Sequence, residues 1–116
     1  MEERRGASRA KVNQLFNVVD RNHGRVLGNL VDISAQGLLI FGKEPVAVDT
    51  VWQLCIELPL AIDGATTIRC GAESLWTDAI GEPPVFWTGF HIIDLAEVER
   101  QRILLLIEQQ SDQAVT

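Results

Sequence analysis

The chain has few of the features that mark secreted, membrane or metal-binding proteins. It contains two cysteines and two histidines among 116 residues, and no CxxC pair. Cys55 and Cys70 lie inside apolar runs, so we expect buried free thiols rather than a disulfide or a metal site. No window approaches the roughly 18 apolar residues of a membrane span, and the charged start lacks the apolar core of a signal peptide. We therefore expect a cytoplasmic protein without a membrane partner.

Positive charge is also scarce, and it is unevenly distributed. The chain carries ten Lys and Arg against sixteen Asp and Glu, a net charge of −6. Residues 1–11, here called the arm, have a net charge of +2, whereas residues 12–116 have a net charge of −8. The cations of the arm are Arg4, Arg5, Arg9 and Lys11. Nucleic acids and anionic membranes require a basic surface, so we exclude both as general partners and expect any bound anion at the arm.

The rest of the sequence predicts one mainly β domain. Segments rich in β-branched and apolar residues are separated by turns rich in Gly, Asn, Asp or Pro. We expect strands at residues 12–20, 25–34, 38–41, 51–58, 66–76 and 85–93, with an Asp-Gly hairpin turn between the fourth and fifth. Gly28 indicates a bulge or tight bend within the second strand.

A helix is expected at the end of the chain. From Ala96 to about Gln110 there is no Gly or Pro and the composition favours a helix. Six short strands followed by one helix predict a six-stranded antiparallel β-barrel with a C-terminal α-helix. Residues 103–107, ILLLI, are apolar on almost every side of that helix. This predicts either a homodimer contact through the helix or a fully buried helix.

The segment VDISAQG, residues 31–37, carries the first candidate binding residues. Because alternate strand residues share a face, we expect Asp32 and Ser34 on the outside of the barrel, with Val31 and Ile33 in the core. Gly37 can adopt a positive φ and leaves room for another molecule beside the backbone. The alternative is a Ser-stabilised turn with a solvated Asp32.

The arm carries the second set of candidates. Arg5 and Arg9 flank Gly6, Ala7 and Ser8, which are small enough for the backbone to wrap a ligand. Guanidinium groups form bidentate bonds to phosphate and to the O6/N7 edge of guanine, and they stack on bases. The alternative is a frayed terminus with solvated arginines.

The two motifs in this order, R-x-x-x-R (Arg5, Arg9) and D-x-S-x-x-G (Asp32, Ser34, Gly37), resemble the PilZ domain, a family of bacterial receptors for cyclic di-GMP. The resemblance covers the arm, the barrel and the helix. It implies that the two arginines contact phosphate and guanine, that Ser34 adds a polar contact and that Gly37 gives clearance. The Asp32 carboxylate matches the N1–H and N2–H₂ donors of guanine.

Further residues take part in the resemblance. It suggests that Arg4 holds a second, stacked ligand molecule and that Trp76 lies near a bound base, although Trp76 can equally be a half-buried barrel aromatic. Gly89 and Phe90 resemble the family's glycine-plus-apolar pattern in the last strand, whereas Ile92 stands where an aromatic residue is common.

The resulting hypothesis is a cyclic di-GMP receptor that is not an enzyme and needs no cofactor. It divides the chain into a flexible clamping arm (1–11), the barrel with its helix (12–110) and a tail (111–116). The arm would become ordered on ligand binding, and the receptor would signal to an unidentified downstream protein in motility, adhesion or biofilm control. Two alternatives remain: a PilZ-like adaptor that binds only protein, and an OB-type nucleic-acid-binding barrel, which the charge of −8 disfavours.

Overall fold

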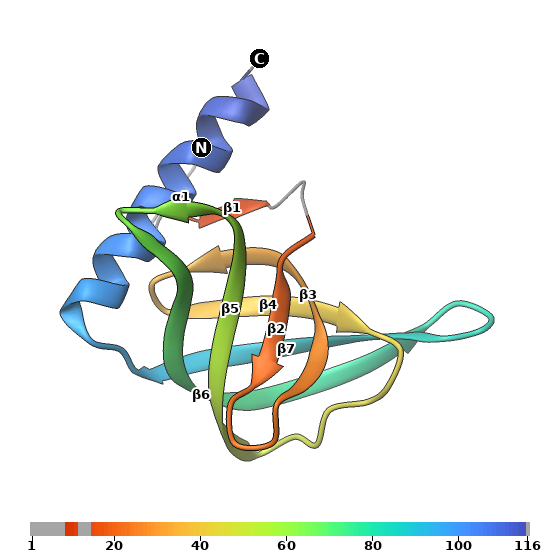
Figure 1. Cartoon of the computed structure of the whole chain (residues 1–116). Coiled ribbons are helices and arrows are strands. Elements are labelled where there is room, and N and C mark those ends of the chain that lie inside the picture. Colours follow the sequence, from red (N-terminus) through yellow and green to blue (C-terminus); the bar gives the residue numbers. More distant parts are fainter. Residues whose placement is uncertain (1–8, 12–14, 116) are drawn as a thin grey trace.

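The structure is a computed structural model that describes residues 9–11 and 15–115, with side chains for residues 15–110. Within these residues it contains seven strands and one helix (Figure 1). In chain order they are β1 (Arg9–Lys11), β2 (Asn17–Asp20), β3 (Arg25–Ser34), β4 (Gly37–Gly42), β5 (Thr50–Ile62), β6 (Ala65–Ile80), β7 (Val85–Asp94) and α1 (Glu97–Val115).

Six of the strands form a closed antiparallel barrel. The hydrogen-bonded order is β3, β2, β5, β6, β7 and β4, and β4 pairs in turn with β3, which closes the ring. β1 and β2 pair with successive parts of β3, so they lie end to end along one side of it. The predicted six-stranded barrel with a C-terminal helix is confirmed. The short β1 was not predicted, because the arm has no apolar pattern.

The strand boundaries follow the sequence pattern closely at β3 and less closely elsewhere. β3 covers the predicted residues 25–34, whereas β5 and β6 extend further and meet at a turn formed by Asp63 and Gly64, which have φ values of 52° and 76°. Positive φ at both central residues matches the twist of a hairpin, so the predicted Asp-Gly turn is confirmed. Of the predicted first strand, residues 12–14 lie outside the described residues, and β2 begins at Asn17.

The hydrophobic core fills the interior of the barrel and continues beneath α1. Its most deeply buried apolar members are at most 2% exposed and come from Phe16, strands β2 to β6 and α1: Phe16, Val18, Leu30, Ile33, Ile40, Leu54, Ile56, Ile68, Ala72, Ile103 and Leu106. β7 adds Phe90 and Ile92, which are 4% and 8% exposed. Apart from bulges, alternate strand residues face inward, as expected for a small filled barrel.

The helix α1 lies against the barrel with one face and leaves another exposed (Figure 1). Ile103, Leu106 and Ile107 are buried, Leu104 is half-buried, and Leu105 is 38% exposed. The alternative of a fully buried helix is therefore wrong for the single chain. A homodimer contact through the exposed part of α1 stays a prediction.

Two glycines allow β3 and β4 to approach closely where the barrel bends. A Cβ atom on Gly28 would collide with the Phe41 carbonyl oxygen, and one on Gly42 would lie 2.5 Å from the Leu27 carbonyl oxygen. On the other side of β3, the register with β2 shifts so that Leu27 is an extra residue. The predicted bulge at Gly28 is thus confirmed, and the need for glycine comes from the neighbouring backbone.

Candidate functional site

The end of β3 contains a bulge that separates the candidate residues. Val31 is an extra residue between Leu30 and Asp32, which pair with consecutive residues of β4. Because a bulge breaks the alternation of faces, the core positions are Leu30 and Ile33, 2% and 0% exposed, while Val31 is half-buried. The prediction that Val31 faces the core is therefore wrong, and that for Ile33 is confirmed. Asp32 is half-buried at the surface.

Ser34 is buried, at 1% exposed, and stabilises the turn into β4. Its Oγ accepts hydrogen bonds from the backbone N–H groups of Gln36 and Gly37, both at 3.2 Å. The hydroxyl also lies 3.5 Å from the Gly37 carbonyl oxygen. The expectation that Ser34 lies on the outside beside Asp32 is wrong, because the side chain is buried and its oxygen accepts from two backbone amides of the turn. The sequence had left open a Ser-stabilised turn, and the structure has one.

Gly37 has a different role from the one expected. Its φ is not among the positive values, so the turn does not require glycine for that reason. Instead, a Cβ atom on Gly37 would lie 2.5 Å from the carbonyl oxygen of Phe90 on β7. The absent side chain therefore makes room for the backbone of β7, and the clearance lies inside the barrel wall.

The last residues of the arm lie beside this motif. In the pairing of β1 with β3, the backbone of Arg9 is opposite Ser34 and that of Lys11 is opposite Asp32. The backbone of Arg9, the last residue of the first motif, therefore lies beside Ser34 of the second motif. Arg4 and Arg5 lie outside the described residues.

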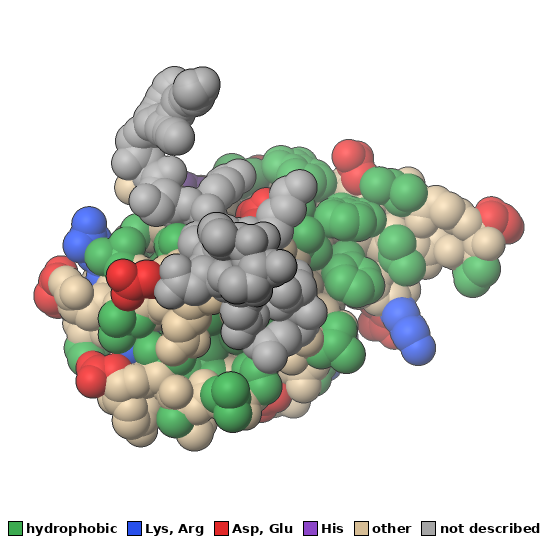
Figure 2. Space-filling view, turned by 90° about the horizontal axis from the view of Figure 1, so that it is seen from above, with side chains coloured by type: hydrophobic (Ala, Val, Ile, Leu, Met, Phe, Trp, Pro, Cys, Tyr) green, Lys and Arg blue, Asp and Glu red, His purple; other side chains and the backbone are tan. Residues whose placement is uncertain are grey.

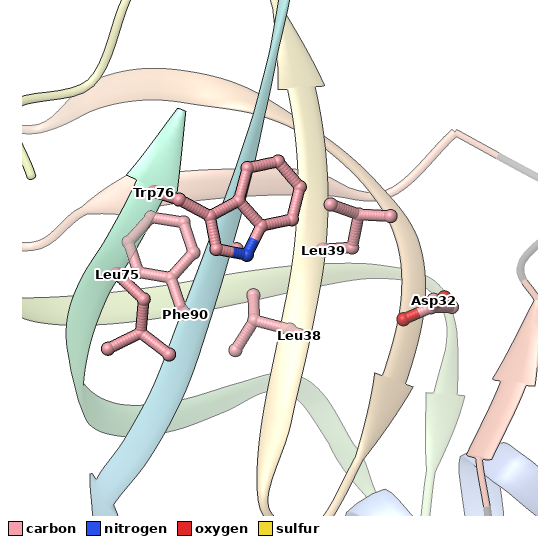
Figure 3. A pocket seen from close by; sticks show the side chains of 7 residues that line it. Asp32, Leu38, Leu39, Leu75, Trp76 and Phe90 are labelled. Atoms are coloured by element: carbon pink, nitrogen blue, oxygen red, sulfur yellow. The ribbon is translucent and has the colours of Figure 1, made fainter. Parts of the chain in front are cut away.

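Asp32 also lines a pocket that spans four neighbouring strands, with a volume of about 250 Å³. We call it the Asp32–Trp76 pocket, and its lining residues are Asp32, Leu38, Leu39, Leu75, Trp76, Gly89 and Phe90. Figure 3 shows the Trp76 indole extending from β6 across β7 towards Leu39 on β4, with Asp32 further along on β3. As far as the described residues show, the pocket thus has apolar walls, two aromatic side chains, of which Trp76 is the more exposed, and one carboxylate.

Trp76 is held in this position by a second bulge and by a glycine. Leu75 is an extra residue in β6, because Ser74 pairs with Phe90 and Trp76 with Gly89. The indole lies directly against Gly89, where a Cβ atom would collide with Nε1 and would lie 2.6 Å from Cε2. Trp76 is 44% exposed, so much of its ring stays accessible. The close contact was not predicted, although a glycine inside a strand is a known sign of one.

Hydrophobic side chains surround the indole on the outer surface. Leu75 is 50% exposed and Ile80, further along β6, is 53% exposed. On the face seen in Figure 2, hydrophobic side chains gather between the body of the barrel and the projecting β6–β7 hairpin. A planar molecule with hydrogen-bond donors at one edge fits these surroundings, since it can cover the apolar surface and donate to an acceptor-only carboxylate.

The family of the chain follows from a comparison with known proteins. A PilZ domain family model matches residues 3–109, which is nearly the whole chain. The chain belongs to the PilZ family. A search of curated protein sequences found no match.

Several solved structures share the PilZ fold at low sequence identity. The PilZ domain of YcgR from Escherichia coli, solved with c-di-GMP, has a TM-score of 0.72 and 12% identity over 97% of this chain and 95% of its own. The Bacillus subtilis inhibitor of motility MotI/DgrA has a TM-score of 0.72 and 14% identity over 97% of this chain and 53% of its own. The K. pneumonia MrkH–c-di-GMP complex has a TM-score of 0.73 and 14% identity over 97% and 55%. This chain therefore spans about half the length of MotI and MrkH.

The PilZ fold brings some of the predicted site residues together and leaves others apart. Asp32 and Trp76 share one pocket, and the backbone of Arg9 lies next to Ser34. Ser34 and Gly37 face the turn and the barrel wall rather than the pocket. Among the described residues, no group of His, Cys, Asp and Glu could hold a metal ion. In the same part of the chain, no helix is long and apolar enough to cross a membrane.

Proposed function

We propose that this PilZ domain is a non-enzymatic receptor for cyclic di-GMP that signals to a partner protein in motility, adhesion or biofilm control. The observation that carries the proposal is the Asp32–Trp76 pocket, which combines an acceptor-only carboxylate with an accessible indole. Two proteins with the same fold, YcgR and MrkH, are described as complexes with c-di-GMP, and MotI is described as an inhibitor of motility. These likenesses support the ligand and the biological setting.

In this proposal one guanine of the ligand enters the Asp32–Trp76 pocket. Its N1–H and N2–H₂ groups donate to the Asp32 carboxylate, which can accept two hydrogen bonds. The base packs against Trp76, and stacking of a base on an aromatic side chain contributes about 1–3 kcal/mol. Adenine has an acceptor at N1 and no 2-amino group, so Asp32 discriminates against it.

The arm supplies the positive charge that the barrel lacks. The described residues 15–110 contain six Lys and Arg against thirteen Asp and Glu, so the barrel itself does not attract phosphate. β1 leads the arm to the end of β3, beside Asp32 and Ser34. From there Arg5 and Arg9 bind the phosphates and a guanine edge through bidentate hydrogen bonds, and Arg4 holds a second ligand molecule. Ser34 contributes indirectly, by fixing the turn that follows Asp32.

The mechanism that we propose is ordering of residues 1–8 over the bound ligand. Fixing one backbone residue costs roughly 1–2 kcal/mol, and hydrogen bonds to charged groups contribute roughly 1.5–3 kcal/mol each. Because Arg9–Lys11 already pair with β3, the cost of ordering applies only to the residues before them. The ordered arm then presents a new surface to the partner.

An adaptor that binds only protein is the second candidate. The hydrogen bonds of Ser34 favour it, because Ser34 and Gly37 then serve the turn and the barrel wall and do not require a ligand. Calorimetric titration with cyclic di-GMP distinguishes the two candidates. We expect saturable binding that is at least tenfold tighter than that of cyclic di-AMP, with most of the difference lost in Asp32→Asn, since one guanine edge contributes about 1–3 kcal/mol of discrimination.

Asp78→Asn is the matched control, because Asp78 is an exposed carboxylate on β6 that does not line the pocket. It should bind both nucleotides as the unmodified protein does. Absence of binding would favour the adaptor, whereas equal binding of the two nucleotides by the unmodified protein would refute the specific recognition of guanine by Asp32. In the same titration, a lower number of bound ligands in Arg4→Ala would identify Arg4 as the residue that holds the second ligand.

A further inference from the structure

A second and larger depression lies at the other end of the same strands. Its volume is about 500 Å³, twice that of the Asp32–Trp76 pocket. We call it the Val26 groove. It is lined by the start of β3, the end of β4 with the residues after it, and the start of β7: Arg25, Val26, Leu27, Gly28, Asn29, Phe41, Gly42, Lys43, Glu44 and Val85.

The surface of the groove is largely apolar. Val26 is 53% exposed, and Phe41 and Val85 are half-buried, so each side chain still offers surface to a partner. At Gly28 and Gly42, β3 and β4 approach so closely that there is no room for a Cβ atom, and glycine needs none. The floor is therefore bare backbone between apolar walls. An extended peptide fits such a surface, since it can place alternate side chains on it.

The charge of the groove differs from that of the barrel around it. Arg25 and Lys43 lie on its rim and are exposed, and neither has an ion-pair partner among the described residues. They account for two of the six Lys and Arg in residues 15–110, which carry thirteen Asp and Glu. Among the residues whose side chains the structure describes, Glu44 is the only acidic one that lines the groove. The rim is thus net positive on an otherwise acidic barrel, which favours a partner with carboxylates.

The groove and the Asp32–Trp76 pocket are built on three shared strands. Asp32, Leu39 and Gly89 line the pocket, whereas Val26, Phe41 and Val85 line the groove on β3, β4 and β7 respectively. At the rise of an extended strand, Val26 and Asp32 are about 15–20 Å apart, whereas Leu39 and Phe41 on β4 are about 7 Å apart. The two sites share no lining residue among those described, so they are adjacent but distinct.

We propose that the Val26 groove binds an extended segment of a partner protein that presents apolar side chains flanked by carboxylates. The apolar side chains cover Val26, Phe41 and Val85, and the carboxylates pair with Arg25 and Lys43. This inference does not rest on nucleotide binding, because no residue of the groove lines the Asp32–Trp76 pocket.

Titration of the isotopically labelled chain with short peptides, followed by NMR, tests the proposal without any nucleotide. The first probe is a peptide with Leu and Phe between two Asp residues. The second has Lys in place of both Asp, and the third has Ser in place of Leu and Phe. We expect the first peptide to shift the backbone amides of residues 25–29 and 41–44 and to bind about tenfold more tightly than the other two. The second peptide reverses both charges that pair with Arg25 and Lys43, and the third lacks the apolar side chains.

Two pairs of variants locate the contact. Val26→Asp and Lys43→Glu should each weaken binding of the acidic peptide about tenfold. The matched controls are Val51→Asp and Arg69→Glu, which change an exposed valine on β5 and an exposed cation on β6 outside the groove. Both controls should leave binding unchanged. Because all four side chains are exposed, the variants are expected to fold, and amide spectra check this directly.

Three results would overturn the proposal. They are no binding of the acidic peptide, equal binding of the lysine peptide, or amide shifts at Trp76 and Gly89 in place of the groove. Nucleotide titration of the same samples is a separate measurement. If the protein binds cyclic di-GMP but no peptide, only the proposal for the Val26 groove is refuted. If it binds the peptide but no nucleotide, only the proposed receptor function is refuted.

Discussion

Replacing Gly89 with alanine should weaken nucleotide binding while leaving the fold nearly as stable. The new Cβ would collide with Nε1 of Trp76 and would lie 2.6 Å from Cε2 and 2.9 Å from Cζ2. Atoms in contact do not approach so closely, so the indole must move by roughly 1 Å or rotate out of the pocket. The side chain can do so because it is 44% exposed and stands at the surface.

The expected change in the free energy of unfolding is small because two effects oppose each other. A tryptophan buries about 150–250 Å² when fully enclosed, so Trp76 buries roughly half of that area. Losing half of its contact, about 50 Å², costs about 1.3 kcal/mol at 25 cal/mol per Å². Alanine in place of a strand glycine returns about 0.5–1 kcal/mol. The net change is therefore expected to stay below about 1 kcal/mol in a urea titration.

The expected loss of affinity is larger. If the indole no longer faces a bound guanine, the lost stacking of about 1–3 kcal/mol weakens cyclic di-GMP binding about 5–150-fold. Calorimetry should show this loss in Gly89→Ala and a similar loss in Trp76→Ala. In the double variant, Gly89→Ala should add almost nothing, because the residue through which it acts is already absent. Additive losses, or an unfolded Gly89→Ala protein, would refute the reasoning.

Three further predictions concern the turns and the arm. Burial acts to raise the pKa of Asp20, but hydrogen bonds from His23 and the Asn22 amide outweigh it, so the pKa lies below the usual 3.8. Asp20 thus stabilises the fold above pH 3.8, and this stability is lost as the pH falls through its folded pKa. The difference in unfolding free energy between the unmodified protein and Asp20→Asn should therefore become smaller towards low pH. A difference that stays constant with pH would contradict this. Ser34→Ala should lower the free energy of unfolding by about 1–3 kcal/mol, because two amides lose their acceptor, and a melting temperature equal to that of the unmodified protein would speak against this role. Trypsin should cut after Arg5 more slowly with saturating cyclic di-GMP, whereas equal cutting rates would reject the proposed clamp.

The sequence was sufficient for the approximate positions of the six barrel strands, because the relevant signals are local. Apolar and β-branched residues bounded by turn residues define β3 within its observed limits, and the Asp63–Gly64 pair determines the β5–β6 hairpin through its positive φ values. Such patterns depend on residues next to one another in the chain. The barrel and its C-terminal helix therefore followed from the sequence.

The details of the site did not follow, because they depend on strands that meet only in three dimensions. The extra residues Val31 and Leu75 shift the register of β3 and β6, and nothing next to them in the sequence marks the shift. The contact between Trp76 and Gly89 forms across two strands. Likewise, Gly37 is required by a carbonyl of β7, whereas the sequence indicated a turn. Because the bulge at Val31 is not marked in the sequence, Val31 was predicted to face the core, whereas it is half-buried at the surface.

The closure of the barrel has a consequence for how the chain assembles during synthesis. β4 can pair with β3 as soon as both have left the ribosome, but its other side must wait for β7, since Gly37 pairs with His91. Until then β4 and β6 each present an unpaired backbone edge, and such edges promote association between chains. Nascent chains and C-terminal truncations that end before β7 are thus expected to aggregate, whereas the completed ring leaves no open edge among its six strands.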